Sequence, residues 1–523
     1  MNEAAVQLKL STSYQSGDEE TYKEIKELLK DTHSEELIIT LCGFIGTDIH
    51  GVSKKLKLIL ENVFSYEVEI INLSTYIKKH SKEAKDLNRE GVTYYEYIKK
   101  LIDGGNELRL SHRSSILAEL CIQKIAFDRH KNRDDKKESA FKTRRKCYII
   151  DSIKNLDELE LFRIVYRDIH YSIGIFSPIH IRKRHLADLE QMKESDIDKL
   201  IDRDSGEEIS HGQKVRDTFI QSDFFLRLDT FVGDAIEKRL ERYLHLIFGS
   251  KVVTPTPDET AMYQASCAAG NSACLSRQVG AALTDKLGEI LSVGWNDVPK
   301  FKGGLYQTDN HDPLGESDSR CFNVGRGCWN DQEKNIIATE LVDILMKSQL
   351  IQEAQRVDFL KAIKKSKIKG LVEFSRAIHA EMHAIITGSQ IAGEKVRGGS
   401  LYITTYPCHN CARHIIVAGI EKVYYIEPYR KSLTTKLHFD AITENEQEKD
   451  KVLILMYDGV APTRFMELFK MTPNSRKSNN GDGRPIDYDF KKAKPKSTLS
   501  LEAIPVLEFK IAEELKKEGL EIQ

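Results

Sequence analysis

SRAIHAEMHA (residues 375–384) and TYPCHNCAR (residues 405–413) are the two stretches around which this 523-residue chain is organised. The first carries His379 and Glu381, and the second carries Cys408 and Cys411. One imidazole and two thiolates form a donor set that suits Zn²⁺, and a catalytic zinc site takes three protein ligands and keeps its fourth position for water. The pattern therefore predicts a catalytic zinc site with His379, Cys408 and Cys411 as the ligands.

Glu381 lies two residues after the predicted imidazole ligand and is not needed to hold the metal. Bound zinc lowers the pKa of its water toward neutrality, so hydroxide becomes available at ordinary pH. The order H-x-E…P-C-x-x-C is typical of zinc nucleobase deaminases. We therefore predict hydrolytic deamination, in which Glu381 carries protons from the water to the ring nitrogen and the leaving ammonia. A thioredoxin-like redox pair would also suit C-x-x-C between a strand and a helix, but it leaves His379 and Glu381 unexplained.

The local pattern places these residues on two helices that flank one strand. Ser375 is the expected N-cap of the first helix. Residues 400–405 are rich in β-branched and aromatic side chains, which predicts a buried strand. Pro407 is expected to open the second helix and Gly419 to end it. Residues 421–428 then predict the next parallel strand.

Length and composition indicate a soluble protein of two or three domains. The chain is too long for one core, and 40% hydrophobic with 30% charged residues is ordinary for a globular protein. The net charge of −2 provides no global basic field for nucleic acid. The sequence has no apolar run of membrane-spanning length and no signal-peptide pattern. Nine cysteines, an odd number, argue against a disulfide framework. We expect a cytoplasmic protein.

A glycine-rich loop follows the strand predicted at residues 36–43, within a first domain expected to cover residues 34–250. Strand, glycine-rich loop and helix are the setting of a phosphate-binding loop. Val52 stands where the phosphate-gripping lysine is expected, which argues against nucleotide hydrolysis. The open alternative is a tight turn without a ligand. The candidate phosphate-binding residues are Gly43, Gly46, Gly51 and Ser53.

The remainder of this first domain alternates predicted strands with helical patterns, which indicates a mainly parallel α/β sheet. Asp151 ends a predicted strand, where nucleotide kinases carry a magnesium-binding acid, and Arg182 and Arg184 are candidate lid arginines. Ordinary ion pairs would supply the same residues. Residues 178–250 are expected to be helical and to bridge to the second domain. The charge-dense run 130–146 is a solvated loop by default and a candidate for polyanion contact.

The second domain is expected to cover residues 251–475. A predicted strand pair at 279–283 and 289–296 ends at Asn296, whose amide is a candidate partner for a sugar hydroxyl or a turn residue before Pro299. The insertion 301–334 raises the hypothesis of a second, structural zinc, although its spacing fits no standard pattern. The ligands of that second zinc would be His311, Cys321 and Cys328. Helices are expected around 335–348 and 355–363, and residues 476–523 are expected to form a flexible linker and a C-terminal helix.

Residues 254 to about 470 resemble the deoxycytidylate deaminases. The shared segments are SRQVGA (276–281), GWNDVP (294–299), HAE (379–381) and PCHNC (407–411). Further segments are similar to those of the bacterial anti-phage dCTP/dCMP deaminases, in which a P-loop kinase-like domain precedes the deaminase domain. These segments are LCGFIGT (41–47), GNELR (105–109), YIIDSIK (148–154) and PCHNCARHII (407–416).

This resemblance implies a fold and an activity. The fold would be an N-terminal P-loop kinase-like parallel sheet domain, with a degenerate loop, joined to a C-terminal cytidine-deaminase-like three-layer α/β/α domain. The activity would be zinc-dependent conversion of dCTP, dCMP or both to deoxyuridine nucleotides, which drains dCTP from an infected cell. Arg277 and Tyr429 join Asn296 as candidate substrate-binding residues. The resemblance also implies homo-oligomers and regulation by a nucleotide or a small noncoding RNA.

Two other hypotheses remain open from the sequence. One is deamination of a polynucleotide, either tRNA or single-stranded DNA, which needs a basic groove with stacking aromatic side chains. The other is regulatory: the N-terminal domain would sense a nucleotide or an RNA and gate the deaminase chemistry.

Overall fold

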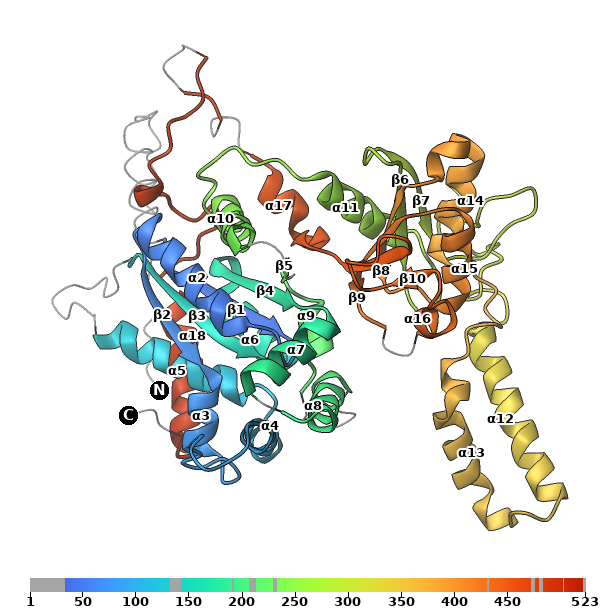
Figure 1. Cartoon of the computed structure of the whole chain (residues 1–523), viewed down its shortest axis with the longest axis horizontal. Helices are drawn as coiled ribbons and strands as arrows, with labels where there is room; N and C mark the ends of the chain where they lie inside the picture. Colours follow the sequence, from blue (N-terminus) through green and yellow to red (C-terminus); the bar gives the residue numbers. More distant parts are fainter. Residues whose placement is uncertain are drawn as a thin grey trace, which may run out of the picture.

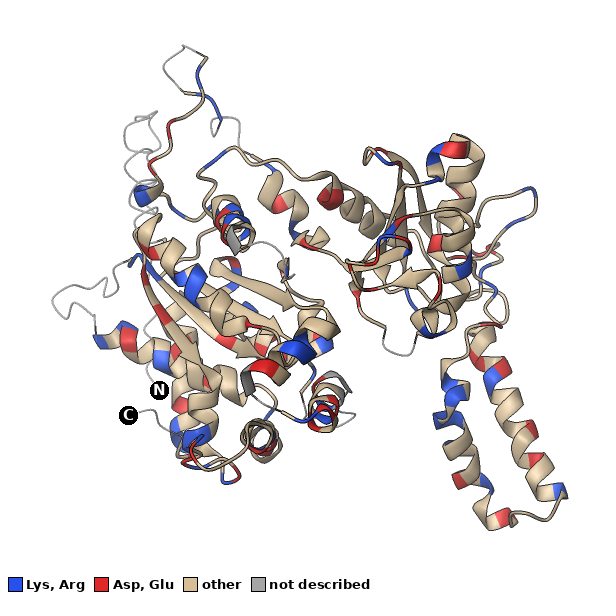
Figure 2. Cartoon of the chain, viewed as in Figure 1, with Lys and Arg blue, Asp and Glu red and all other residues tan. Residues whose placement is uncertain are grey.

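The computed structural model describes residues 33–131, 143–190, 192–206, 213–228, 233–429, 432–471, 476–478, 483–501 and 503–520. They form two lobes, each built on a six-stranded sheet (Figure 1). Lys and Arg lie interspersed with Asp and Glu over both lobes (Figure 2). The charge-dense run 130–146 falls largely outside the described residues. None of the described helices has the length and apolar character needed to cross a bilayer.

The first sheet has the strand order β12-β5-β4-β1-β3-β2, and its strands are parallel except for the short β12. Strands β1, β3 and β4 are almost wholly buried, as expected for parallel strands covered on both faces. The predicted mainly parallel sheet is confirmed. Its strands are β1 (Leu37–Gly43), β2 (Glu67–Asn72), β3 (Lys146–Ile153), β4 (His170–Phe176), β5 (Phe224–Arg227) and β12 (Gly459–Val460).

Helices cover both faces of this sheet because alternate strand residues are apolar on both sides. Leu37 and Ile39 of β1 share a core with α2 and α10, whereas Ile38 shares a core with α5 and α6. The helices of this lobe are α2 (Ile49–Asn62), α3 (Leu73–His80), α4 (Tyr94–Ser111), α5 (Ile116–Lys131), α6 (Leu156–Tyr166), α7 (Ile179–Glu190), α8 (Glu194–Gly206), α9 (Val215–Phe219) and α10 (Gly233–Phe248).

Residues 178–250 are not wholly helical, contrary to our prediction, because β5 lies among them and pairs in parallel with β4. Four residues between charged helices are too short a run to show the two-residue period of a strand. The first sheet also takes β12, which pairs antiparallel with β5. The chain therefore returns to the first lobe before the boundary expected at residue 475.

The second sheet has the order β10-β11-β9-β8-β6-β7, in which β6 runs antiparallel to both of its neighbours and the other pairs are parallel. The strands predicted at 279–283, 289–296, 400–405 and 421–428 are confirmed. The elements are α11 (Pro257–Ala269), β6 (Gly280–Thr284), β7 (Ile290–Trp295), α14 (Ala380–Ala392), β8 (Ser400–Thr405), α15 (His409–Val417), β9 (Lys422–Glu427), α16 (Thr434–Leu437), β10 (Ile442–Thr443) and β11 (Val452–Met456).

Two glycines allow helices to cross this sheet closely. A Cβ on Gly280 of β6 would lie 1.8 Å from the carbonyl oxygen of Ala265 in α11. A Cβ on Gly294 of β7 would lie 2.5 Å from the carbonyl oxygen of Ala380 in α14. Gly280 pairs across the strands with the residue after Gly294, so the two glycines face opposite sides of the sheet. Helices α11 and α14 therefore form the outer layers of a helix–sheet–helix sandwich.

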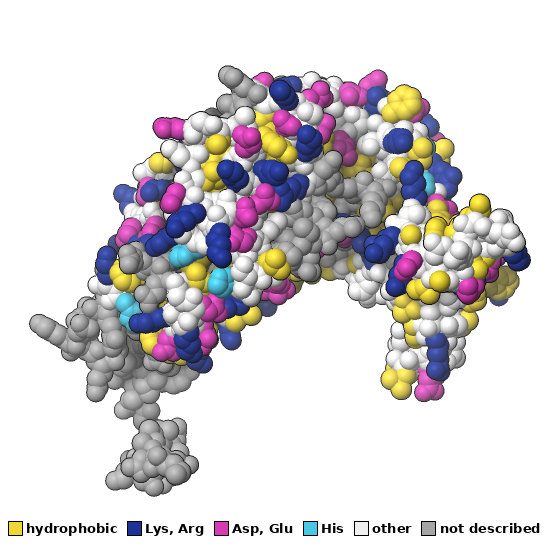
Figure 3. Space-filling model, turned by 90° about the horizontal axis from the view of Figure 1, so that it is seen from below, with side chains coloured by type: hydrophobic (Ala, Val, Ile, Leu, Met, Phe, Trp, Pro, Cys, Tyr) yellow, Lys and Arg dark blue, Asp and Glu magenta, His cyan; other side chains and the backbone are white. Residues whose placement is uncertain are grey.

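A helical arm projects from the second lobe (Figure 1). It consists of α12 (Trp329–Lys347) and α13 (Arg356–Lys365), close to the ranges predicted from the sequence. Helix α12 buries only Ala338 and Val342, and α13 buries none of its residues. Hydrophobic side chains are visible on the surface of the right-hand lobe when the molecule is viewed from below (Figure 3). Those exposed on the arm are Ile336, Leu341, Ile344, Leu350, Val357 and Phe359.

The C-terminal helix α18 (Ala503–Lys517) is confirmed, and it packs against α5 of the first lobe. Glu508 of α18 is 1% exposed and accepts hydrogen bonds from Arg129 Nε and from the Tyr166 hydroxyl, both at 2.9 Å. Arg129 also donates to Glu36 at 2.7 Å. A short helix, α17 (Phe465–Phe469), contacts α10 of the same lobe. The last part of the chain is therefore anchored on the first lobe by a buried ion-pair network.

We expect Glu508→Ala to lower the free energy of unfolding by about 3 kcal/mol, because it leaves a buried guanidinium short of one carboxylate. The loss stays at the low end of the usual range because Glu36 still pairs with Arg129. Glu514→Ala, on the exposed face of the same helix, removes only a surface pair with Lys517 and should cost less than about 1 kcal/mol. Urea unfolding curves would measure both changes, and equal losses would contradict the buried anchor.

Candidate active site

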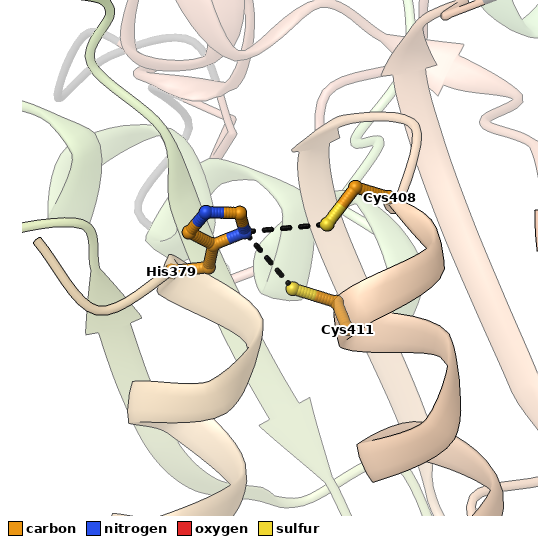
Figure 4. A group of neighbouring side chains, drawn as sticks. All are labelled: His379, Cys408 and Cys411. Carbon is orange, nitrogen blue, oxygen red and sulfur yellow. Dashed lines mark hydrogen bonds between the residues drawn. The ribbon is translucent and has the colours of Figure 1, made fainter. Parts of the chain in front are cut away.

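Three side chains from the starts of two adjacent helices converge in the second lobe (Figure 4). His379 is the N-cap of α14, Cys408 is the N-cap of α15, and Cys411 lies in the first turn of α15. The His379 Nδ1 atom lies 3.3 Å from Cys408 Sγ and 3.2 Å from Cys411 Sγ. The structure thus brings together the three predicted zinc ligands. Within the described ranges, this is the one group of at least three His, Cys, Asp or Glu side chains that could hold a metal ion.

The donor atoms fit a zinc ion. Tetrahedral zinc with Zn–N of about 2.1 Å and Zn–S of about 2.3 Å places such a nitrogen and sulfur about 3.6 Å apart. The distances of 3.2 and 3.3 Å in the structure are close to that value. Both thiols lie at the start of α15, where the positive end of the helix dipole favours thiolates.

The first helix starts later than we predicted, at Ala380, and Ser375 is not its N-cap. The amide of Ile378 donates to the carbonyl oxygen of Asp297 at 3.0 Å, in an antiparallel bridge that keeps the backbone extended up to His379. The second helix starts at His409 and is followed by Gly419 with a φ of +70°, so the predicted glycine ending is confirmed. The sheet therefore sets where the imidazole stands.

The three ligand side chains are electrostatically coupled. A hydrogen bond with Cys411 lowers the pKa of the Cys408 thiol to about 4, whereas burial raises the pKa of Cys411 well above its usual value. The hydrogen bond with Cys408 raises the pKa of His379 to about 9. Without a bound metal, these shifts favour a thiolate on Cys408 beside a protonated His379. Zinc binds deprotonated thiolates and neutral imidazole, so loading the site releases protons.

Glu381 lies in the first turn of α14 and is 4% exposed. It lines the same cavity as His379 and Cys408. Burial raises the pKa of its carboxyl group above the ordinary range. A carboxyl group with a raised pKa can accept and return a proton near neutral pH, as a general acid–base catalyst must.

A cavity of about 330 Å³ opens beside this cluster, within the size range of small-molecule sites. The three predicted substrate-binding residues, Arg277, Asn296 and Tyr429, all line it. Tyr406, Lys334 and Lys369 also line it, and sequence analysis missed all three. Lys334 lies far in sequence from the motifs, whereas Lys369 lies shortly before the stretch at 375–384; neither stands in a pattern that marks it as a site residue. Tyr406 directly precedes Pro407 and could have been found from that position.

Asn296 directly follows β7, and its amide orders the loop that carries Arg277. Its Oδ1 accepts a hydrogen bond from the Val279 amide at 2.7 Å, and its Nδ2 donates to the Arg277 carbonyl oxygen at 2.8 Å. An asparagine side chain has two N–H donors and one carbonyl oxygen. These two bonds leave one N–H of Asn296 for a ligand in the cavity.

Arg277 shares a carboxylate with an arginine of the first lobe. Its Nη1 atom lies 3.1 Å from Glu427 Oε1, at the end of β9. Arg216 of α9 forms an ion pair with the same oxygen. Thr405 Oγ1 donates to the other Glu427 oxygen at 3.2 Å. The Glu427 carboxylate thus links Arg216 of the first lobe to Arg277 of the candidate active site.

The glycine-rich loop between β1 and α2 holds a carboxylate of the chain itself. Asp48 is the N-cap of α2, and its Oδ1 accepts from the Gly51 amide at 2.8 Å. A Cβ on Gly51 would lie 2.0 Å from Asp48 Oδ2, and Gly46 has a φ of +82°. Both glycines therefore have local structural roles, and Asp48 occupies the helix start where an anion would bind. Phosphate binding by Gly43, Gly46, Gly51 and Ser53 stays a prediction.

The other predicted residues of the first lobe lie in different surroundings. Asp151 is buried in β3, with Oδ2 at 2.5 Å from His50 Nδ1 and 3.4 Å from Ser53 Oγ. Arg182 Nε donates to the Ile45 carbonyl oxygen of the loop at 2.6 Å, whereas Arg184 is exposed on α7. The structure thus brings Asp151 and Arg182 to the loop, but not Arg184.

The hypothesised second zinc finds no support within the described part of the chain. His311 lies in an exposed turn, whereas Cys321 and Cys328 line a small cavity of about 20 Å³ together with Cys274. The metal-binding group described above does not include them. The long insertion separates the imidazole from the two thiols, which spacing alone could not show.

Residues 255–427, about a third of the chain, match the family model of the cytidine and deoxycytidylate deaminase zinc-binding region. The chain thus contains a deaminase zinc-binding domain, and the cofactor of the His379, Cys408 and Cys411 site is zinc.

Individual relatives match parts of the chain. ComE operon protein 2 of Bacillus subtilis is 38% identical over 82 residues, which are 15% of this chain and 43% of that protein. The deoxycytidylate deaminase of Enterobacteria phage T4 is 27% identical over 161 residues, which are 31% of this chain and 72% of that protein. The dCMP deaminase from cyanophage S-TIM5, solved in complex with dCMP and dUMP, aligns 99% of its length with 39% of this chain at 19% identity and a TM-score of 0.23.

We expect Cys411→Ala to abolish zinc retention, because it removes one of three ligands and leaves the ion open to water. The wild-type protein should retain about one zinc ion per chain after dialysis. Cys274→Ser is the matched control, since Cys274 lines the same cavity outside the ligand group. Elemental analysis of the purified proteins measures the metal. Equal zinc in both variants would show that the cysteine ligand is assigned wrongly.

Proposed function

We propose that the chain is a zinc-dependent hydrolytic deaminase of free deoxycytidine nucleotides, acting on dCMP, dCTP or both. The observation that carries this proposal is the buried Glu381 beside three converging zinc ligands, in one cavity of about 330 Å³. The match to the cytidine and deoxycytidylate deaminase region and the phage relative named deoxycytidylate deaminase support it.

Three cationic side chains of the cavity favour a nucleotide over a nucleoside. Arg277, Lys334 and Lys369 line it together with the aromatic Tyr406 and Tyr429. A guanidinium and ammonium groups bind phosphate oxygens, and aromatic faces suit a base. Lys and Arg positions are interspersed with Asp and Glu positions along the elements of both lobes (Figure 2), whereas a polynucleotide substrate needs a continuous basic groove.

The proposed mechanism assigns a role to each residue of the site. His379, Cys408 and Cys411 would hold the zinc ion, and the ion would supply the Lewis acidity that activates a water for attack on C4 of cytosine. Glu381 accepts a proton from that water and delivers protons to the ring nitrogen and the departing ammonia. Asn296 orders the 277–279 loop and directs its remaining N–H toward the sugar. Arg277 binds the phosphate.

For the first lobe we propose a P-loop kinase-like domain that no longer hydrolyses nucleotides. The parallel strands, the glycine loop after central β1, and Asp151 facing Ser53 support the architecture. Val52 and the Asp48 carboxylate at the helix start argue against hydrolysis. We place residues 34–250 in this domain and 251–475 mainly in the deaminase domain, with β12 and the C-terminal helix returning to the first lobe.

The biological role proposed from the family resemblance is anti-phage defence by depletion of dCTP. We also propose a homo-oligomer, because six exposed apolar side chains on the arm form a surface of the kind that associates with another protein surface. Light scattering would measure the mass of the oligomer.

The family resemblance also motivates the proposal that a small RNA regulates the protein. Purification with and without co-transcribed flanking sequence would test for a bound RNA.

We expect ammonia release from dCMP or dCTP but not from a single-stranded deoxycytidine oligonucleotide. A zinc chelator should abolish this turnover, because the metal activates the water. Glu381→Gln should lower kcat at least 100-fold while zinc is retained, because the amide cannot carry protons. A coupled assay of ammonia measures each rate. Turnover of the oligonucleotide alone would instead establish a polynucleotide deaminase.

Arg277→Ala should raise KM for dCMP about tenfold while leaving KM for deoxycytidine within about twofold, because only the nucleotide carries a phosphate. Arg413→Ala is the control, since Arg413 is an exposed arginine of α15 that does not line the cavity. Steady-state kinetics on both substrates measure the difference. An equal change for nucleotide and nucleoside would rule out phosphate binding by Arg277.

A further inference from the structure

A second cavity, of about 170 Å³, lies between the two lobes. The first lobe contributes the Phe44 side chain of the glycine-rich loop, Phe176 at the end of β4, and Arg182 and Arg216. The second lobe contributes Tyr406, Tyr425, Pro428, Tyr429 and Glu444 among others. The cavity thus exists only when both lobes are in place.

Aromatic side chains form the walls of this interlobe cavity. Phe44 and Phe176 lie edge to face with ring centroids 6.2 Å apart, and Tyr406 and Tyr425 do the same at 4.8 Å. The Arg182 guanidinium lies over the Phe44 ring, 5.3 Å from its centroid. Flat apolar walls of this kind suit a planar aromatic ligand. The volume of about 170 Å³ suits a small ligand.

Polar groups in the cavity suit a small anion. Arg182 and Arg216 supply two positive charges, which Asp204, at 4.0 Å from Arg182, and Glu427 partly offset. The Arg216 Nε atom is buried without a hydrogen-bond partner among the described residues. Glu444 accepts a hydrogen bond from the Tyr406 hydroxyl at 2.8 Å. The small net positive charge of these side chains favours a ligand with one phosphate. The larger negative charge of a triphosphate would not be neutralised by them.

We propose that the interlobe cavity is a regulatory site for a nucleoside monophosphate or another planar nitrogen heterocycle with one anionic group. This inference rests on the proposed deaminase function, because it makes the ligand a regulator of that site.

Two connections link this cavity to the candidate active site. Tyr406 and Tyr429 line both cavities. Arg216 also pairs with Glu427, whose other cationic partner is Arg277. A ligand anion that draws Arg216 away leaves Glu427 to pair with Arg277 alone, so Arg277 is less available to the substrate phosphate. Occupancy should therefore raise KM for dCMP rather than lower kcat.

Calorimetric titration of the full-length protein with GMP, AMP, guanosine and inorganic phosphate tests the site. Ile179, at the start of α7, lines the cavity and is 41% exposed, so a larger side chain can enter the cavity without disturbing a core. We expect Ile179→Trp to weaken binding of the monophosphates at least tenfold, whereas Ile179→Ala leaves it within threefold. Melting temperature and zinc content check that both variants are folded. Guanosine and phosphate alone should each bind at least tenfold more weakly than GMP.

Kinetics then test the regulatory role. At saturating GMP or AMP, KM for dCMP should rise at least threefold in the wild type and stay unchanged in Ile179→Trp. The proposal is overturned if neither monophosphate binds, if Ile179→Trp binds as well as the wild type, or if binding leaves KM unaltered. Turnover of dCMP without these effects would leave the proposed function standing. Site-specific binding without turnover of any deoxycytidine nucleotide would instead reject the proposed function.

Discussion

The close crossing of α14 over β7 is the constraint on which the active site depends. Gly294 has no side chain, and the Ala380 carbonyl that fills its place belongs to the residue directly after His379. The antiparallel bridge between Ile378 and Asp297 also fixes the backbone directly before His379. Any side chain at position 294 would displace the first turn of α14, and with it both the imidazole and Glu381. The metal site therefore depends on sheet packing as much as on its ligands.

The sequence predicted the chemistry of the site better than the architecture around it. His379, Glu381, Cys408 and Cys411 were found because their residue types and short spacings reflect zinc chemistry directly. The start of α14 was misplaced because an antiparallel bridge overrides the capping preference of Ser375. Strand β5 and Lys334 were missed because their roles arise from contacts between distant segments. Local pattern carries no information of that kind.

The glycine-rich loop shows how one pattern can serve two purposes. Its glycines stand where a phosphate-binding loop would have them, yet Gly51 leaves room for the Asp48 carboxylate and Gly46 supplies a left-handed turn. Phe44 of the same loop lines the cavity shared with the other lobe. In the structure, the loop thus joins the first sheet to the surface that meets the deaminase domain, a use that the glycine spacing alone does not reveal.

Because the chain returns to the first lobe, the deaminase domain is connected to that lobe at both of its ends. Strand β12 completes the first sheet, and α18 is locked onto α5 through Glu508. The deaminase domain is therefore inserted into the first lobe and is joined to it by two chain connections, one at each of its ends. A truncation that ends the chain after residue 250 would remove the deaminase domain and, with it, β12 and α18 of the first lobe.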